Sequence, residues 1–239
     1  MATRASRGSK VWIDHYDMSG FLNAAEFAFE RELIDRQTFA TTGPSVELGN
    51  YTHRGSAVTL FDGATAQSDD ILHALFDTSN HYRAIAPGAG TLGSVVVEQV
   101  VTAARKPHRG ANGQIITMAD EWVGAGEVSQ GHVLANTTAT ATGVYTGVQQ
   151  TELTTASKYQ SVVRALTGSS FSITVDIESS SDNVTFTTMP GMTATLTQAA
   201  RVSRITSTGG SKAYKRARVS ARSGSATAVA LVVTGGLVY

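Results

Sequence analysis

The sequence predicts a mainly β fold, organised as two β-rich modules with one short helix. Charged residues make up only 16% of the 239 residues and aromatic residues only 7%. Glycine, threonine, serine, alanine and valine are frequent instead, and small and β-branched side chains in this proportion favour sheet over helix. Short runs that alternate apolar and polar residues recur along the chain between glycine-rich turns, a pattern typical of antiparallel strands.

The composition also limits the chemistry of the chain. There is no cysteine, which excludes a disulfide framework, a thiolate metal site and a cysteine nucleophile. No apolar run reaches the roughly 18 residues of a membrane-spanning helix. The basic residues 1–10 are not followed by the apolar region of a signal peptide. We therefore expect a soluble protein that is made in the cytoplasm and has no membrane partner.

A formal net charge of zero conceals a difference between two parts of the chain. Residues 1–150 carry 10 Lys and Arg against 15 Asp and Glu, and residues 151–239 carry 9 against 4. This split predicts two modules in different surroundings, with chance scatter of surface charge as the alternative. We predict modules at residues 1–135, beginning with a flexible arm over residues 1–10, and at residues 151–239. A linker rich in threonine, alanine and glycine would span residues 136–150.

Residues 11–23 combine aromatic, acidic and turn-forming residues in the order Val-Trp-Ile-Asp-His-Tyr-Asp-Met-Ser-Gly-Phe-Leu-Asn. This order predicts a short strand, a tight turn at residues 17–20 and entry into a second strand. It resembles the opening of the major tail proteins of long-tailed bacteriophages, the subunits that stack into the tail tube. The matching positions are Ile13, Asp14, Tyr16, Asp17, Ser19, Gly20 and Asn23.

Residues 24–34 predict a strand with one apolar and one acidic face. The apolar face holds Ala25, Phe27, Phe29 and Leu33, and the acidic face holds Glu26, Glu30 and Glu32. Like charges at alternate positions repel one another, so this face must be hydrated. It is either ordinary solvated exterior or the wall of a water-filled channel.

Residues 39–54 predict a long loop or an extended hairpin arm, because Gly43-Pro44 and Gly49-Asn50 interrupt them. Loops of this length inside compact domains usually serve an interaction. In the tail tube family a long loop between two strands reaches toward the adjacent ring. The resemblance therefore implies an inter-ring role for Val46, Leu48 and Tyr51.

The next segments predict a strand at residues 56–62 and then the one helix of the chain, at residues 69–77. Ser68 is the expected N-cap, and Asp69 and Asp70 suit the first turn. Further strands are predicted over residues 82–87, 94–104, 114–123 and 127–135. The glycines Gly88, Gly90 and Gly93 match a dinucleotide-binding spacing, but a strand follows where that motif needs a helix, so they predict a hairpin turn.

The remaining residues predict seven short strands, which suggest an immunoglobulin-like or jelly-roll-like β-sandwich. The predicted strands cover residues 159–166, 171–178, 184–188, 192–196, 201–208, 213–222 and 228–238. Two runs, at residues 175–186 and 214–219, resemble sandwich modules that are often appended to phage structural proteins. Those modules are also similar to carbohydrate-binding modules.

No motif of an enzyme or of a metal or cofactor site is present. The sequence has no nucleophile elbow, Walker loop, zinc-protease helix or EF-hand loop, and its six histidines have no metal-ligand spacing. The cations of residues 105–113 fit a solvated hairpin tip or an acidic partner better than a phosphate site. We expect no catalytic residue, no metal and no cofactor.

Taken together, the resemblance implies a virion protein of the phage tail whose copies form rings, usually hexameric, that stack into a tube. Its fold would be a tail-tube-type β-sandwich or barrel with a flanking helix. Other tail proteins would be its partners, and genome DNA would pass through the lumen without specific binding. Glu26, Glu30 and Glu32 would line that lumen, because like charge keeps phosphates from adhering. The alternatives are a carbohydrate-binding or adhesin-type protein and a capsid decoration protein.

Overall fold

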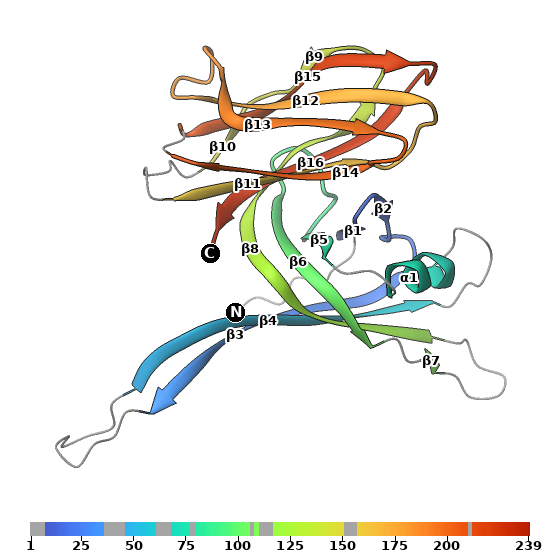
Figure 1. Cartoon of the computed structure of the whole chain (residues 1–239), viewed down its shortest axis with the longest axis vertical. Helices are drawn as coiled ribbons and strands as arrows, with labels where there is room; N and C mark the ends of the chain where they lie inside the picture. Colours follow the sequence, from blue (N-terminus) through green and yellow to red (C-terminus); the bar gives the residue numbers. More distant parts are fainter. Residues whose placement is uncertain are drawn as a thin grey trace. The chain divides into compact units, whose positions relative to one another are not determined.

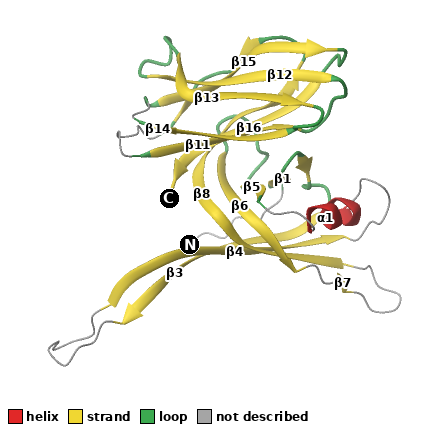
Figure 2. Ribbon diagram, in the orientation of Figure 1, coloured by secondary structure: helices red, strands yellow, loops and turns green. Residues whose placement is uncertain are grey.

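The computed structural model describes residues 8–35, 46–60, 68–76, 80–105, 108–109, 117–150, 157–209 and 212–239. These residues form strands and one helix, α1 (Figures 1 and 2). The strands belong to two antiparallel sheets, and no barrel closes among the residues described. The prediction of a mainly β fold with one short helix is confirmed.

Contacts between Cα atoms divide the chain into two units that differ from the predicted modules. One unit comprises Met1–Gly20, Tyr82–Val100 and Glu127–Tyr239, and the other Phe21–His81 and Val101–Gly126. Antiparallel pairing produces this interleaving, because residues 10–13 pair with residues 83–86 and residues 129–139 pair with residues 229–238. Composition along the chain carries no signal for such pairing.

The larger unit contains a β-sandwich. One sheet has the strand order β14-β11-β16-β8-β6-β5-β1-β2, and the other has the order β10-β15-β12-β13 with β9 beside β15. Strands β6 and β8 also enter the second unit. The strands of the larger unit are β1 (Lys10–Ile13), β2 (Tyr16–Asp17), β5 (His81–Ala86), β6 (Val95–Arg105), β8 (Thr117–Ala139), β9 (Gly143–Val144), β10 (Val148–Gln149), β11 (Lys158–Ala165), β12 (Phe171–Ser180), β13 (Thr187–Thr197), β14 (Val202–Thr208), β15 (Tyr214–Gly224) and β16 (Val229–Val238).

Strand β16 is buried on both faces, which explains its nearly continuous apolar sequence. Leu231 and Val233 point into the core between the two sheets, where they join Ile173 of β12. Successive strand residues point to opposite faces, and Val232 accordingly packs in a second cluster with Trp12 of β1. Burying a side chain of this size contributes about 1.5–3 kcal/mol.

The second unit is built on the hairpin of β3 (Leu22–Asp35) and β4 (Val46–Leu60). Strand β4 continues the sheet by pairing with the first part of β8, which also pairs with β7 (His108–Arg109). The helix α1 (Ser68–Phe76) buries Ile71, Leu72 and Leu75. Ser68 was expected to cap this helix, and its Oγ donates a hydrogen bond to the carbonyl of Leu60 (2.7 Å).

The predicted loop over residues 39–54 is wrong for its second part, because residues 46–54 belong to β4. At the register shift between Arg31 and Leu33 of β3, strand β4 carries one extra residue as a bulge, and the hairpin continues on both sides of it. The alternative reading, an extended hairpin arm, fits this strand. Residues 39–45 lie outside the described part of the chain.

Two further breaks were predicted where the structure has continuous strands. The break between the strands expected at residues 114–123 and 127–135 lies inside β8, and the two strands expected at residues 184–188 and 192–196 are replaced by β13 alone. Residues 136–139, assigned to the linker, are the end of β8 and pair with β16. The glycine-rich turn of residues 88–93 is present, and Gly88, Gly90 and Gly93 all have positive φ.

Candidate functional site

The exposed face of the β3–β4–β8 sheet in the second unit is the first candidate site. In register, Glu26 lies opposite Ser56, which lies opposite Glu121. The next row on the same face joins Ala28, Arg54 and Val123. Directly opposed residues point to the same side of a sheet, so both rows belong to one surface.

The other face of this sheet is buried, which determines where the acids point. Ala57, Trp122 and Val101 form an apolar cluster there. Gly55 lies opposite Trp122, and a Cβ atom on Gly55 would lie 2.5 Å from the indole ring. Because the strand alternates, burying this face leaves Glu26 and Glu30 exposed.

The exposed face is less acidic than the sequence indicated. Arg54 forms an ion pair with Glu30, and both side chains remain largely exposed. Glu26, Glu30, Arg54 and Glu121 line an open hollow of about 510 Å³. Arg54 was missed because it fell in the expected loop, and Glu121 because the pairing of β4 with β8 has no local signal.

The side chains of the other residues predicted for this surface are not among those that the structure describes. The backbone of β3 and β4 is defined, but the side chains of Glu32, Val46, Leu48 and Tyr51 are not among those described. The lumen-facing and inter-ring roles of these residues therefore stay predictions.

The opening motif forms a hairpin, β1–β2, that is held by its own polar side chains. Asp17 accepts hydrogen bonds from the Lys10 ammonium (2.8 Å), the Ser19 amide (3.0 Å) and the Ser19 hydroxyl (2.5 Å). Ser19 Oγ in turn accepts the amide of Val11 (2.9 Å). Burial raises the pKa of Asp17, but the donors Lys10 and Ser19 outweigh it and hold the pKa below its usual value.

Asp14 fixes the same hairpin to β5. It adopts a left-handed conformation (φ 48°), its carboxylate accepts the amide of Tyr82 (2.8 Å), and its own amide donates to the Tyr82 carbonyl (2.9 Å). Ile13 is buried, Tyr16 is half-buried and Gly20 is exposed; the side chain of Asn23 is not described. The motif residues that can be placed thus have structural contacts: Asp17 and Ser19 hold one turn, and Asp14 bonds the backbone of Tyr82 in β5.

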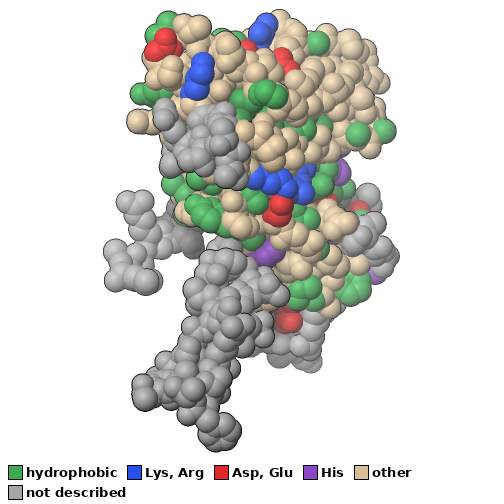
Figure 3. Space-filling model, turned by 60° about the vertical axis from the view of Figure 1, so that its left-hand side comes forward, with side chains coloured by type: hydrophobic (Ala, Val, Ile, Leu, Met, Phe, Trp, Pro, Cys, Tyr) green, Lys and Arg blue, Asp and Glu red, His purple; other side chains and the backbone are tan. Residues whose placement is uncertain are grey.

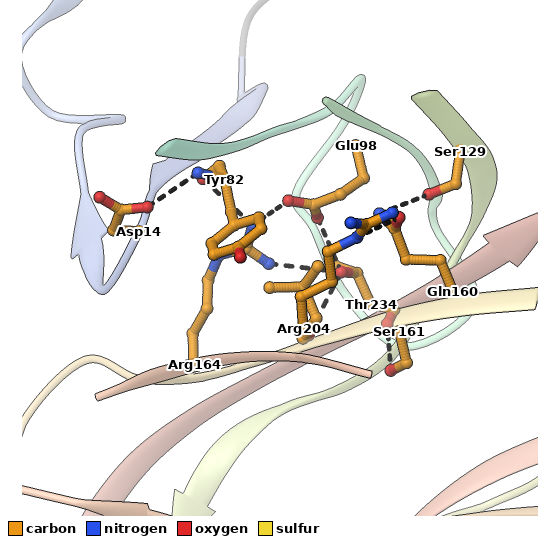
Figure 4. Close-up of polar contacts among 10 residues, drawn as sticks. Asp14, Tyr82, Glu98, Ser129, Gln160, Ser161, Arg164, Arg204 and Thr234 are labelled. Carbon is orange, nitrogen blue, oxygen red and sulfur yellow. Dashed lines mark hydrogen bonds and ion pairs between the residues drawn. The ribbon is translucent and has the colours of Figure 1, made fainter. Parts of the chain in front are cut away.

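A buried polar network in the sandwich unit had no counterpart in the sequence analysis (Figure 4). The guanidinium of Arg164, fully buried, forms an ion pair with Glu98 and donates to Thr234 Oγ1 (3.3 Å) and to the Tyr82 carbonyl (3.3 Å). Thr234 Oγ1 donates to the second oxygen of Glu98 (2.8 Å). This network joins β5, β6, β11 and β16.

At the surface of the same unit, Glu127 joins Lys158 (2.5 Å) and Arg204 in a second group of ion pairs. These cations hold the pKa of Glu127 below its usual value. The face shown in Figure 3 likewise presents basic and acidic side chains beside one another. Glu98 and Glu127 come from the acidic part of the chain, and their partners come from the basic part.

The described part of the chain contains no group of three or more His, Asp or Glu side chains that could hold a metal ion. None of its helices is long and apolar enough to cross a membrane.

Comparison with known proteins gave structural likenesses only. No family model matches the chain, and no curated protein matches it. One similar solved structure is a component of the virion of a native gene transfer agent particle, with 17% identity, a TM-score of 0.42, and coverage of 54% of this chain and 98% of the other.

A chain from the tail of an empty gene transfer agent particle, refined with C6 symmetry, has 16% identity, a TM-score of 0.41, and coverage of 53% and 98%. The SPP1 Dit protein, described as a hub of the adsorption apparatus, has 9% identity, a TM-score of 0.40, and coverage of 96% and 98%. All three are components of phage or phage-like tails and virions. Likenesses at this level are too distant to assign a family.

Proposed function

We propose that this chain is a structural subunit of a phage tail whose copies assemble into stacked rings, with the exposed face of the β3–β4–β8 sheet toward the lumen. The observation that carries the proposal is the two-faced sheet: Glu26 and Glu30 are exposed on one side, and Trp122 is buried on the other. The opening motif at residues 13–23 supports it through its resemblance to major tail proteins.

The free edge of β3 supports assembly. Strand β3 is 14 residues long, and among the described strands it pairs only with β4. Most strands are about half as long, and a long open edge tends to pair with another chain. A neighbouring copy that pairs with this edge would extend the sheet around a ring.

The lumen assignment follows from charge. Each copy contributes Glu26, Glu30 and Glu121 to the exposed face, and Arg54 offsets one of these charges. Repeated around a ring, this surface is negative, and it repels a phosphate backbone without forming a specific contact. The absence of a recognised catalytic motif agrees with a structural role, and the tube would serve as the passage for genome DNA.

Negative-stain electron microscopy of the concentrated, purified protein tests this proposal. Rings or tubes with a central channel are the expected result. Discrete monomers under all conditions would favour a carbohydrate-binding or adhesin-type protein, and trimers that do not polymerise would favour a capsid decoration protein.

A further inference from the structure

A separate pocket lies in the sandwich unit, on the sheet face that carries the core. Its volume is about 280 Å³, and its lining residues are Val95, Gln130, Gly131, His132, Gln150, Leu237 and Tyr239. In register, Gln130 lies opposite Leu237, and His132 opposite Gly235. The alternation of the two strands therefore places Gln130, His132, Leu237 and Tyr239 on one face.

The missing side chain of Gly235 helps to shape the pocket. A Cβ atom at this position would lie 2.3 Å from the hydroxyl oxygen of Tyr159. The glycine lets the buried Tyr159 reach across the sandwich and donate a hydrogen bond to Gln150 Oε1 (3.2 Å). Burial raises the pKa of Tyr159, so the hydroxyl stays protonated and acts as this donor.

Two polar atoms at the pocket are buried and have no hydrogen-bond partner among the described residues. They are His132 Nδ1 and Gln150 Nε2. Tyr159 occupies the oxygen of the Gln150 amide, which leaves the N–H donors of Gln150 without a partner among the described residues. Leaving a buried polar group unsatisfied costs about 1–3 kcal/mol, so both atoms favour an occupant that forms hydrogen bonds.

The occupant should be uncharged. None of the described residues that line the pocket is Lys, Arg, Asp or Glu. Burial lowers the pKa of His132, and Lys215 lowers it further, so the imidazole is neutral at pH 7. Lys215, which is fully buried, is not among the lining residues, so no described lining side chain offers a charge to a ligand. A hydroxyl group, which both donates and accepts, satisfies an amide and a neutral imidazole equally well.

We propose that this pocket binds a neutral saccharide. Gln150 and His132 bind ligand hydroxyls at the base, and the exposed Gln130 amide adds a contact at the rim. The apolar side chains of Val95 and Leu237 face the C–H groups of the sugar ring, and the Tyr239 ring, 71% exposed, provides a stacking surface at the mouth. This binding site is independent of the proposed ring assembly.

Saturation-transfer NMR on the full-length chain tests the proposal, with glucose, galactose, N-acetylglucosamine and their disaccharides as probes and glucuronate as the anionic comparator. We expect saturable binding of at least one neutral sugar in preference to glucuronate. His132→Phe and Tyr239→Ala should each weaken it up to about tenfold, the loss of one hydrogen bond or stacking contact. Gln149→Ala is the matched control, because Gln149 is exposed and does not line the pocket.

Three results would overturn the proposal. The first is no saturable signal from any neutral sugar, which would mean that only water occupies the pocket. The others are equal or tighter binding of glucuronate, and sugar binding that neither substitution changes. Thermal melting checks that each variant folds. If His132→Phe does not fold, the surface variant Tyr239→Ala decides the outcome. Because ring formation does not enter the measurement, the result is separate from the test of the tail function.

Discussion

Arg164 and Glu98 form an ion pair that is almost completely shielded from water. Removing one partner of such a pair leaves a buried charge without compensation, at a cost of about 3–5 kcal/mol. We therefore expect Glu98→Leu to lower the urea midpoint of unfolding strongly. The double variant Glu98→Leu with Arg164→Met should recover most of the loss, because it leaves no unpaired charge.

The exposed pair of Arg54 and Glu30 provides the control for this measurement. Arg54→Met should leave the free energy of unfolding nearly unchanged, since exposed ion pairs contribute little. A double variant at residues 98 and 164 that is as unstable as the single one would show that the pair contributes more than its desolvation costs.

Asp17 predicts a pH-dependent stability of the opening hairpin. Its pKa in the folded protein lies below the usual value, as a result of the Lys10 and Ser19 contacts that outweigh burial. A depressed pKa contributes stability that is present above the unfolded pKa, near 3.9, and is lost as the pH falls through the folded pKa. Asp17→Asn should cost on the order of 1 kcal/mol at pH 7. This difference should shrink toward zero in acid; an equal difference at pH 7 and in acid would contradict the charge-based account.

For individual residues, the sequence predicted the tight turn and the exposed acids, but it did not predict which residues form ion pairs with the acids. Residues 17–20 predicted a tight turn, and Asp17 and Ser19 do form it. The partner of Glu98 lies 66 residues away along the chain, and that of Glu30 lies 24 residues away. Pairing at such separations depends on strand register, which no local pattern encodes.

Among the elements, the packing of β4 against β8 depends on a glycine. The Trp122 ring covers Gly55 on the neighbouring strand, where a Cβ atom would overlap it. Gly55→Val should therefore destabilise the second unit by about 1–3 kcal/mol, the range of overpacking substitutions. Gly143→Val is the matched control, because nothing lies within 4 Å of its Cβ position. Urea unfolding followed by the fluorescence of Trp12 and Trp122, one in each unit, measures both variants, and equal effects would refute the packing argument.

The ends of the strands were the least predictable features, because glycine and proline residues that predict turns lie inside strands that pair with their neighbours. Pro190 lies inside β13 at a register shift, between the paired residues Thr188 and Thr193, where no ladder pair with β12 needs its missing N–H. Gly124 lies inside β8 where a Cβ atom would overlap the ring of His53. In both places a residue that predicts a turn is accommodated within a strand.

Hydrogen exchange tests whether the free edge of β3 is an assembly edge. In an isolated subunit, the β3 amides that point away from β4 should exchange rapidly, because no described strand covers them. In assembled particles the same amides should become protected, while those bonded to β4 change little. Unchanged rapid exchange of these amides in intact rings would exclude pairing at this edge.

For the whole molecule, the charge split between the two parts of the chain has a different meaning from the predicted one. Glu98 and Glu127 bind Arg164, Lys158 and Arg204 within one unit. The acidic and basic parts are thus complementary inside the sandwich unit, and the split does not separate two modules. The mainly β class followed from composition and alternation, whereas the interleaved division of the chain depends on long-range pairing.

The last prediction concerns the lumen of the proposed tube. Glu26, Glu30 and Glu121 lie on the exposed face of one sheet and are not part of its core. At physiological salt their field extends about 8 Å from the wall, which suffices to keep a phosphate backbone from adhering. Replacing all three by Lys should leave rings intact, but particles should eject their genome slowly or incompletely, because the altered wall attracts DNA. The matched triple Gln variant removes charge without reversing it and should eject at nearly the normal rate. Normal ejection by the Lys variant, or a ring structure with these residues on its outer surface, would refute the assignment.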